Sequence, residues 1–315
     1  MPLERKDLLD LDDFSSEEIT LLLETTAAMT EILSRPIRRV PTLRGKTIVN
    51  MFYEASTRTR SSFELAAKNL SADLVNVSAS QSSVEKGESL IDTMRTLQAL
   101  GADMLVMRHW EAGAPYLAAS WLHASVINAG DGWHAHPSQA LLDLYTVQER
   151  RGAIEGLKLV IVGDILHSRV ARSNLWGFGK MGARVVLCGP PTLVTPDILG
   201  IAENLPWVTI SYDLDEAIAD ADVVMMLRLQ RERMASGLLP SLREYAARFG
   251  LTQKRMRRAR PNALIMHPGP MNQGVEITPE LAYSEQAVIE DQVANGVAVR
   301  MAIFYLLAGT SERIA

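Results

Sequence analysis

The amino-acid sequence predicts an α/β protein made of two doubly wound parallel-sheet domains with a cleft between them. The first observation is length, because 315 residues suit two domains of roughly 100 to 200 residues better than one core. The second is that apolar strand-like runs alternate with helical patterns in two successive series. The third is that no Pro- or Gly-rich linker separates the series, so the domains are expected to pack closely and hinge.

The first half begins with a helix and continues as an alternating series. Ser15 and Glu18 fit a capping box, and apolar residues then recur at helical spacing, which predicts a helix over 16–34. Pro36 and Pro41 end that helix. Strands are expected at 47–52, 74–77, 104–107 and 125–128, with helical stretches between them.

A helix over 137–150 leads into the second series, and we place the domain boundary there. Strands are expected at 157–162, 184–187, 208–211, 223–226 and 263–266, followed by one long terminal helix over 288–307. The sequence therefore predicts a first domain over 1–140, a second over 141–287, and a C-terminal helix over 288–315 that returns to the first domain.

Composition narrows the function classes. The formal net charge of −5 argues against general nucleic-acid binding, so any anion site must be local. Cys188 is the only cysteine, which excludes an intrachain disulfide and suits a reducing cytoplasm. The N-terminus shows no signal-peptide pattern, and apolar runs such as 301–309 fall short of the ~18 residues of a membrane span. We expect a soluble, cytoplasmic protein.

Three motifs point to functions that their context disfavours. The letters of a dinucleotide fingerprint occur at 177–182, but this run ends a helix instead of following a strand. Gly45-Lys46-Thr47 resembles the end of a P-loop, yet Val40 stands where its first glycine belongs. The basic run 254–260 is explained more simply by a solvated helix face than by nucleic acid.

The most informative stretch follows the strand at 47–52 and opens a helical pattern. It reads Ser56-Thr57-Arg58-Thr59-Arg60-Ser61-Ser62-Phe63-Glu64. Unpaired backbone N–H groups at a helix start attract anions, and the guanidiniums and hydroxyls added here suit a phosphate. The alternative is a capping Ser or Thr followed by arginines that face water.

Other candidates follow later strands. Residues 82–89 form a polar loop in which Lys86 precedes a glycine, which fits either a mobile anion-binding loop or a plain surface loop. Arg108 closes the strand that begins at Met104, and ligands bind at the carboxyl ends of strands in open α/β sheets. His134 and His136 could be metal ligands, but no thiolate or carboxylate completes a set in sequence, so we expect no metal.

The run from Ser56 to Glu64 closely resembles the carbamoyl phosphate signature of the transcarbamoylase family, whose two main members transfer a carbamoyl group to aspartate or to ornithine. The stretch from His136 to Asp143 resembles a second motif of that family. The resemblance covers essentially the whole chain, with its motifs in family order. It implies that the first half binds carbamoyl phosphate, that the acceptor then binds to the second, and that domain closure brings them together.

Charge selects between the acceptors. The stretch 163–169 ends with Arg169, and the stretch 228–233 contains Arg228. Paired guanidiniums suit a dicarboxylate, whereas the cationic tail of ornithine would be repelled by them. Pro268 in His267-Pro268-Gly269-Pro270 stands where ornithine enzymes typically carry Cys, as in the aspartate branch. Gly269 stands where some members have Leu or Ala, so the resemblance does not define the backbone geometry of that turn.

The resemblance implies roles residue by residue. Carbamoyl phosphate would be bound by Ser56, Thr57, Arg58, Thr59, Arg108, His136, Gln139 and, from the neighbouring subunit, Ser82. Aspartate would be bound by Lys86, which also comes from the neighbouring subunit, and by Arg169, Arg228, Gln230, Pro268 and Gly269. The catalytic residues among these would be Arg58, Thr59, Lys86, Arg108 and His136. Glu54 would pair with an arginine in the closed form.

The implied reaction is the committed step of de novo pyrimidine biosynthesis, in which carbamoyl phosphate and L-aspartate give N-carbamoyl-L-aspartate and phosphate without a cofactor. Family members work as homotrimers with shared active sites, and some join regulatory chains or dihydroorotase subunits. Two alternatives stay open at this point. Ornithine or another amino acid could be the acceptor, or the chain could be a non-catalytic anion-binding subunit.

Overall fold

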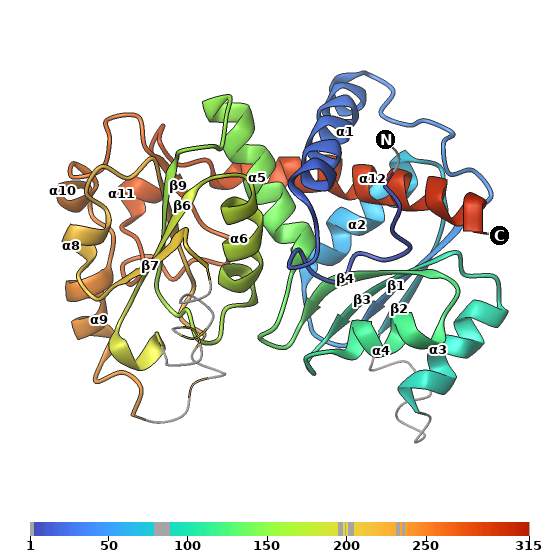
Figure 1. Ribbon diagram of the computed structural model, residues 1–315, viewed down its shortest axis with the longest axis horizontal. Helices are drawn as coiled ribbons and strands as arrows, with labels where there is room; N and C mark the ends of the chain where they lie inside the picture. Colours follow the sequence, from blue (N-terminus) through green and yellow to red (C-terminus); the bar gives the residue numbers. More distant parts are fainter. Residues whose placement is uncertain are drawn as a thin grey trace. The chain divides into compact units, whose positions relative to one another are not determined.

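The computed structural model describes residues 3–78, 89–194, 198, 200, 205–230, 234 and 237–314. Contacts divide the chain into two units, which Figure 1 shows in ribbon form. Unit 1 comprises Met1–Tyr145 and Val293–Ala315, and unit 2 comprises Thr146–Gln292. Each unit contains a parallel sheet with flanking helices, so the predicted fold class is confirmed.

In the described part of unit 1, the strands form a 4-stranded parallel sheet in the order β2-β1-β3-β4. Its members are β1 (Thr47–Phe52), β2 (Asp73–Ser78), β3 (Met104–His109) and β4 (Ser125–Asp131). Every residue of β3 and β4 is buried. Such burial explains why these strands read as apolar runs without strict alternation.

Helices cover both faces of this sheet (Figure 1). On one face lie α3 (Leu90–Ala99) and α4 (Ala114–Trp121), where Met94 and Ala118 pack against Met51 of β1 and its neighbours. The other face carries α1 (Ser16–Ser34), α2 (Thr57–Asn69) and α12 (Ile289–Ile314). The rings of Phe63 in α2 and Phe304 in α12 lie 5.7 Å apart, so the C-terminal helix packs on the first unit as predicted.

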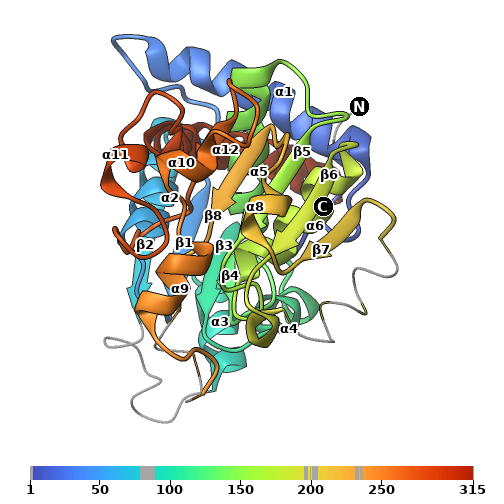
Figure 2. The ribbon, with the colours of Figure 1, turned by 90° about the vertical axis from the view of Figure 1, so that its left-hand side faces the viewer.

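In the described part of unit 2, the strands form a 5-stranded parallel sheet in the order β7-β6-β5-β8-β9. Figure 2 shows this unit toward the viewer. The strands are β5 (Lys158–Val162), β6 (Arg184–Cys188), β7 (Val208–Ser211), β8 (Val223–Met226) and β9 (Leu264–Met266). The helix α5 (Pro137–Arg151) connects the two units.

Short helices pack on one face of this second sheet, around Val160 and Val224. They are α8 (Leu214–Ala217), α9 (Leu242–Phe249), α10 (Gln253–Met256) and α11 (Pro279–Ala282), with the 3-10 turn η3 (Pro191–Leu193). The helix α6 (Arg169–Lys180) covers the other face (Figure 1). Because α6 ends at Lys180, before β6, the glycine-rich run at 177–182 closes a helix, as the sequence predicted. It is therefore not a dinucleotide-binding fingerprint.

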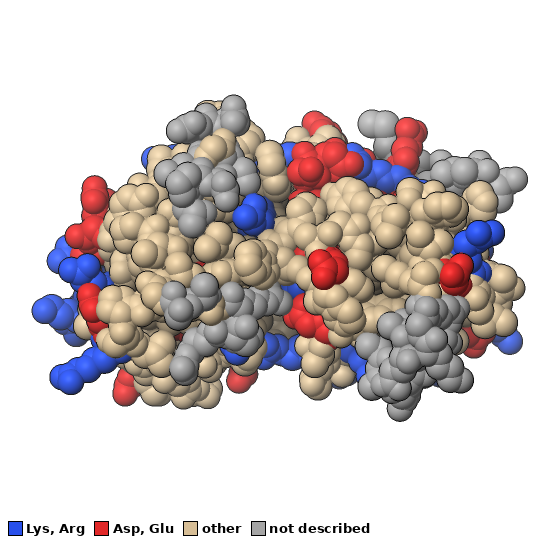
Figure 3. Space-filling view, turned by 90° about the horizontal axis from the view of Figure 1, so that it is seen from below, with Lys and Arg blue, Asp and Glu red and all other residues tan. Residues whose placement is uncertain are grey.

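Basic side chains gather at the left-hand end of Figure 3, where α8, α9 and α10 lie. The basic run at 254–260 belongs to this end and is partly paired within unit 2. Arg255 Nε lies 3.2 Å from Asp215 Oδ1, and Arg260 Nη1 lies 3.0 Å from Asp222 Oδ1. The run therefore combines structural ion pairs with a solvated face.

Among the described residues, Ile289–Gly309 in α12 is long and apolar enough to cross a membrane, although most of it is buried in the molecule. The sequence analysis predicted this helix over 288–307 but not a span-length apolar stretch, because charged residues such as Asp291 and Arg300 interrupt the apolar runs. One such helix is weak evidence for a span, since buried core helices have the same composition.

Candidate active site

The order of strands defines a topological switch point in unit 1. From β1 the chain proceeds outward to β2, and from β3 it proceeds outward on the other side to β4, so the direction of winding reverses between β1 and β3. Ligands in open α/β sheets bind at such a switch point, outside the carboxyl ends of the strands. The register places Phe52 of β1 beside Arg108 of β3. The start of α2 and the end of β3 therefore share one edge of the sheet.

The start of α2 is open toward this edge. Its N-cap residue, Ser56, has an extended backbone but makes no side-chain cap hydrogen bond, and the first turn holds no acidic residue. By contrast, Ser15, Ser89 and Ser168 all cap their helices. The positive end of α2 is thus not offset by an acidic residue of its own first turn, which suits an external anion. In this first turn Thr59 is buried, whereas Thr57 and Arg58 are exposed.

Arg108 is held at the end of β3 by two neighbouring segments. Its Nη1 donates to the carbonyl of Ala129 in β4 at 3.2 Å, and its Nη2 donates to Glu54 Oε1 at 2.7 Å. Glu54 thus pairs with an arginine inside unit 1, because it follows β1 directly beside β3, and its pairing in a closed form stays a prediction. Arg108 is 8% exposed, so its charge lies in a poorly solvated position beside the start of α2.

The loop after β4 positions His136 and Gln139. Asp131, fully buried, accepts hydrogen bonds from the backbone N–H of Gly113 and of Ala135, at 2.7 and 3.0 Å, and so fixes the turn. His136 is 4% exposed, and its carbonyl accepts the N–H of Gln139 at 2.9 Å. Gln139 Nε2 donates to Asp143 Oδ1 at 2.9 Å, which orients the side-chain amide.

Unit 2 has its own switch point, between β5 and β8. After β5, Asp164 accepts from His167 Nδ1 at 2.8 Å, and its second oxygen accepts the N–H of Gln230 from the segment after β8 at 3.3 Å. Gln230 Nε2 donates to the carbonyl of His167 at 2.9 Å. These bonds join the segments that carry Arg169, 6% exposed at the start of α6, and half-buried Arg228.

Pro268 and Gly269 follow β9, the strand beside β8. Gly269 has φ of +66°, a left-handed conformation that glycine adopts without strain, and its N–H donates to His267 Nδ1 at 2.8 Å. The turn at 267–270 therefore has a backbone geometry that depends on a glycine at position 269.

A residue that the sequence reading missed ties these segments together. Glu276 is fully buried and accepts the N–H of Leu229 at 2.8 Å through Oε1, while its Oε2 lies 3.2 Å from His267 Nε2. Asn272 donates to it from both its backbone and its side chain, at 2.8 and 2.7 Å. No sequence signal could have identified Glu276, because its role depends on the adjacency of β8 and β9.

The structure thus brings the predicted residues together in two groups. Ser56, Thr57, Arg58, Thr59, Arg108, His136 and Gln139 lie at the edge of the unit 1 sheet, and Arg169, Arg228, Gln230, Pro268 and Gly269 at that of the unit 2 sheet. Ser82 and Lys86 lie outside the described residues.

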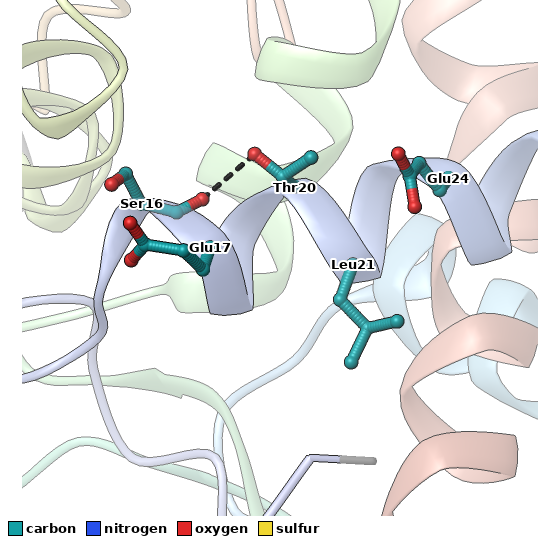
Figure 4. Close-up of a pocket in the computed structure, with 5 residues that line it drawn as sticks. All are labelled: Ser16, Glu17, Thr20, Leu21 and Glu24. Atoms are coloured by element: carbon teal, nitrogen blue, oxygen red, sulfur yellow. Dashed lines mark hydrogen bonds between the residues drawn. The ribbon is translucent and has the colours of Figure 1, made fainter. Parts of the chain in front are cut away.

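A surface hollow elsewhere in unit 1 is unrelated to these groups. It is lined by Ser16, Glu17, Thr20, Leu21 and Glu24 along one helix, α1 (Figure 4). The Thr20 hydroxyl donates to the carbonyl of Ser16 at 2.8 Å. Two carboxylates and no cation line the hollow, so it is unsuited to an anionic ligand.

Two doubly wound units, each with anion donors at its switch point, define a class of α/β protein that binds small anionic substrates. Comparison with family models identifies the protein family. Residues 6–149 match the carbamoyl-P binding domain of aspartate/ornithine carbamoyltransferase, and residues 155–307 match the Asp/Orn binding domain. The chain belongs to the aspartate/ornithine carbamoyltransferase family.

Relatives and solved structures agree with this placement. The aspartate carbamoyltransferase catalytic subunits of Roseiflexus sp. (strain RS-1) and Chloroflexus aurantiacus are 68% and 63% identical over 97% of this chain, covering 96% and 99% of those proteins. The aspartate transcarbamoylase of Trypanosoma cruzi in complex with N-(phosphonacetyl)-L-aspartic acid superposes with a TM-score of 0.88 at 30% identity, over 96% of this chain and 97% of that one. The ornithine carbamoyltransferase of Pyrococcus furiosus gives 0.87 at 29%, over 98% and 99%.

Proposed function

We propose that this chain is the catalytic chain of an aspartate carbamoyltransferase, which transfers the carbamoyl group of carbamoyl phosphate to the α-amino group of L-aspartate. The observation that carries this proposal is the 68% identity, over nearly the full chain, to a relative named as the catalytic subunit of that enzyme. The fold alone does not select the acceptor, since the ornithine enzyme superposes almost equally well.

The edge of the unit 1 sheet is the proposed carbamoyl phosphate site. The open start of α2 would bind the phosphate through its N–H groups, the hydroxyls of Ser56, Thr57 and Thr59, and Arg58. Arg108, Thr59 and His136 would donate to the oxyanion that develops on the carbamoyl group, and each such donor is worth about 3 kcal/mol in other enzymes. Gln139 would contact the carbamoyl amide, while Ser82 would complete the phosphate site.

The edge of the unit 2 sheet is the proposed aspartate site. Arg169 and Arg228 would bind the two carboxylates, with Gln230, Pro268 and Gly269 shaping the pocket and Lys86 contributing a further charge. The neutral α-amino group then attacks the carbamoyl carbon and forms a tetrahedral intermediate. Collapse breaks the bond to the phosphate oxygen, and the departing phosphate takes the amino proton.

A carbamoylation assay tests the acceptor directly. The purified chain with carbamoyl phosphate should form N-carbamoyl-L-aspartate from L-aspartate, with little product from L-ornithine, because an ammonium tail is repelled by Arg169 and Arg228. Equal or faster carbamoylation of ornithine would contradict the aspartate assignment. Loss of all activity would instead favour the non-catalytic anion-binding subunit.

The phosphate role of Arg58 gives a sharper prediction. Arg58→Ala should lower turnover by about 10²- to 10³-fold, because a charged donor to the departing phosphate is lost. Steady-state kinetics measures the effect, and thermal unfolding shows whether the fold persists. Lys68→Ala is the matched control, since Lys68 lies at the other end of α2 and pairs with Glu64. Unchanged turnover in Arg58→Ala would refute the phosphate assignment.

The wider setting is part of the same proposal. A product that is a carbamoylated aspartate suits the committed step of pyrimidine biosynthesis, in the cytoplasm. We also propose a homotrimer in which Ser82 and Lys86 act in the active site of the adjacent subunit. Regulatory or dihydroorotase subunits would be additional partners, detectable by copurification.

A further inference from the structure

A buried arginine outside the proposed reaction lies on the far side of α2. Arg300 of α12 is 3% exposed, and its Nη1 donates at 2.9 Å to both the Ser62 hydroxyl and the carbonyl of Gly296. Its guanidinium carbon lies 4.8 Å from the centroid of the Phe63 ring, which adds a cation–π contact. Ser62 and Phe63 belong to the helix whose first turn is the proposed phosphate site. Arg300 therefore fixes α2 to α12.

The surroundings are shaped to hold this guanidinium. A Cβ on Gly296 would lie 2.6 Å from Arg300 Nη1 and 3.5 Å from Ser62 Oγ, so glycine leaves room for the guanidinium in its present position. A buried cation costs considerable desolvation free energy unless it has partners. The structure thus accommodates a charged residue where an apolar one would pack at lower cost.

Electrostatic interactions link Arg300 to the proposed site. Burial, together with the charge of Arg108, lowers the pKa of Arg300 to about 9, and the charge of Asp143 opposes both effects. Arg300 therefore remains a cation at neutral pH. Asp143 is fully buried and accepts the amide of Gln139, a proposed carbamoyl ligand. Arg300 is thus coupled electrostatically to Arg108 and, through Asp143, to Gln139.

We propose that Arg300 is a positioning residue for carbamoyl phosphate, which holds α2 in place through Ser62 and Phe63 and adds a buried positive charge to that of Arg108. The inference rests on the proposed function. The two cations repel each other when the site is empty, and a bound phosphate group offsets that repulsion. Part of the affinity for the anion thus comes from a residue that does not touch it.

The test compares Arg300→Met, which keeps length without charge, with Arg300→Lys. Titration calorimetry with carbamoyl phosphate should show about tenfold weaker binding by Arg300→Met, the size expected for one charge acting at medium range. Arg300→Lys should lose less affinity than Arg300→Met, since its amine can still carry charge although it lacks the planar guanidinium. The KM for aspartate should stay nearly unchanged in both variants, because Arg300 acts on unit 1.

Arg35→Met is the matched control, because it removes an exposed cation of unit 1 that pairs with Glu31. It should bind carbamoyl phosphate like the wild type. Unchanged affinity in Arg300→Met overturns the proposal. Equal losses for carbamoyl phosphate and aspartate, accompanied by a lower melting temperature, also overturn it, because they indicate a purely structural role.

Should Arg300→Met fail to fold, Ser62→Ala tests the same link at its other end. A weaker affinity for carbamoyl phosphate with an unchanged KM for aspartate supports the proposal, and wild-type affinity overturns it. Failure of the proposed function is distinguishable, because the wild-type chain would then neither bind carbamoyl phosphate nor carbamoylate aspartate.

Discussion

Single residues at the two sheet edges are oriented by carboxylates that touch no proposed substrate. Glu54 holds Arg108, Asp143 holds Gln139, and Asp164 holds the backbone of Gln230. Asp143 and Asp164 are fully buried and Glu54 is half-buried, and each accepts a donor from a nearby residue. Cationic and amide side chains kept in fixed directions lose less entropy when a ligand binds, which favours tight positioning.

His134 gives a prediction for pH dependence. Its hydrogen bond to Asp131 raises its pKa, with help from the charges of Asp131, Asp10 and Asp12. A raised pKa in the folded state contributes stability below the unfolded value of about 6.5, and this contribution is lost as pH rises through the folded pKa. His134→Gln should therefore lower the melting temperature more at about pH 5.5 than at about pH 9. These two pH values lie about one unit or more below and above the unfolded-state pKa of about 6.5.

Thermal unfolding at the two pH values measures this difference. The exposed His123 provides the control variant His123→Gln. A gap between wild type and His134→Gln that is independent of pH, or that widens at alkaline pH, would contradict the role of the imidazolium.

Among the elements, α6 shows how one glycine can serve packing while it imitates a ligand-binding motif. A Cβ on Gly179 would lie 1.8 Å from the indole nitrogen of Trp207, which itself donates to the carbonyl of Leu175 at 3.3 Å. The Trp207 ring lies flush against the helix backbone just before β7 begins. The second glycine of the fingerprint-like run is thus required by a tryptophan.

Gly179→Ala should destabilise the protein by about 1–3 kcal/mol, the usual cost of overpacking a tight interface. Gly309→Ala is the matched control, because Gly309 is also helical and has open space where its Cβ would lie. The control should raise the melting temperature slightly, since alanine favours helices. A melting temperature for Gly179→Ala equal to or above that of the wild type would contradict this prediction, because it would show that the Trp207 ring moves aside at little cost.

At the scale of the whole molecule, the two units share one topology, a parallel sheet with an internal switch point. Both sheets reverse their winding at an internal pair of strands, β1 and β3 in one and β5 and β8 in the other. Both place basic residues at the carboxyl ends of that pair, Arg108 in unit 1 and Arg228 in unit 2. The arrangement suits a reaction with two anionic substrates, one for each unit.

The proposed homotrimer is tested by mixing subunits. If Lys86 acts in the site of a neighbouring chain, combining Lys86→Ala with Arg58→Ala under conditions that exchange subunits should restore part of the activity. Some sites in the hybrids then receive two intact contributions. Mixing Arg58→Ala with Arg108→Ala should restore none, because both defects lie in the same unit of one chain. Inactive hybrids despite demonstrated exchange would exclude the cross-subunit role.

Most elements were predictable because their signals are local. The capping box of Ser15 and Glu18 and the apolar spacing after it predicted α1 over its full length. The apolar runs of β1, β7 and β8 likewise gave correct bounds. By contrast, β4 continues to Asp131, beyond the predicted end at Asn128, because the polar end of the strand is buried against its neighbours.

The sequence by itself determined the alternation of strands and helices, the family motifs and the identity of the residues proposed to bind substrates. Only the tertiary structure decided which distant side chains support them: Glu54 beneath Arg108, Glu276 between two loops, and Arg300 behind α2. The reason is physical. Periodicity and caps act between residues close in the chain, whereas the partner of a buried charge is set by which strands and helices come to lie side by side.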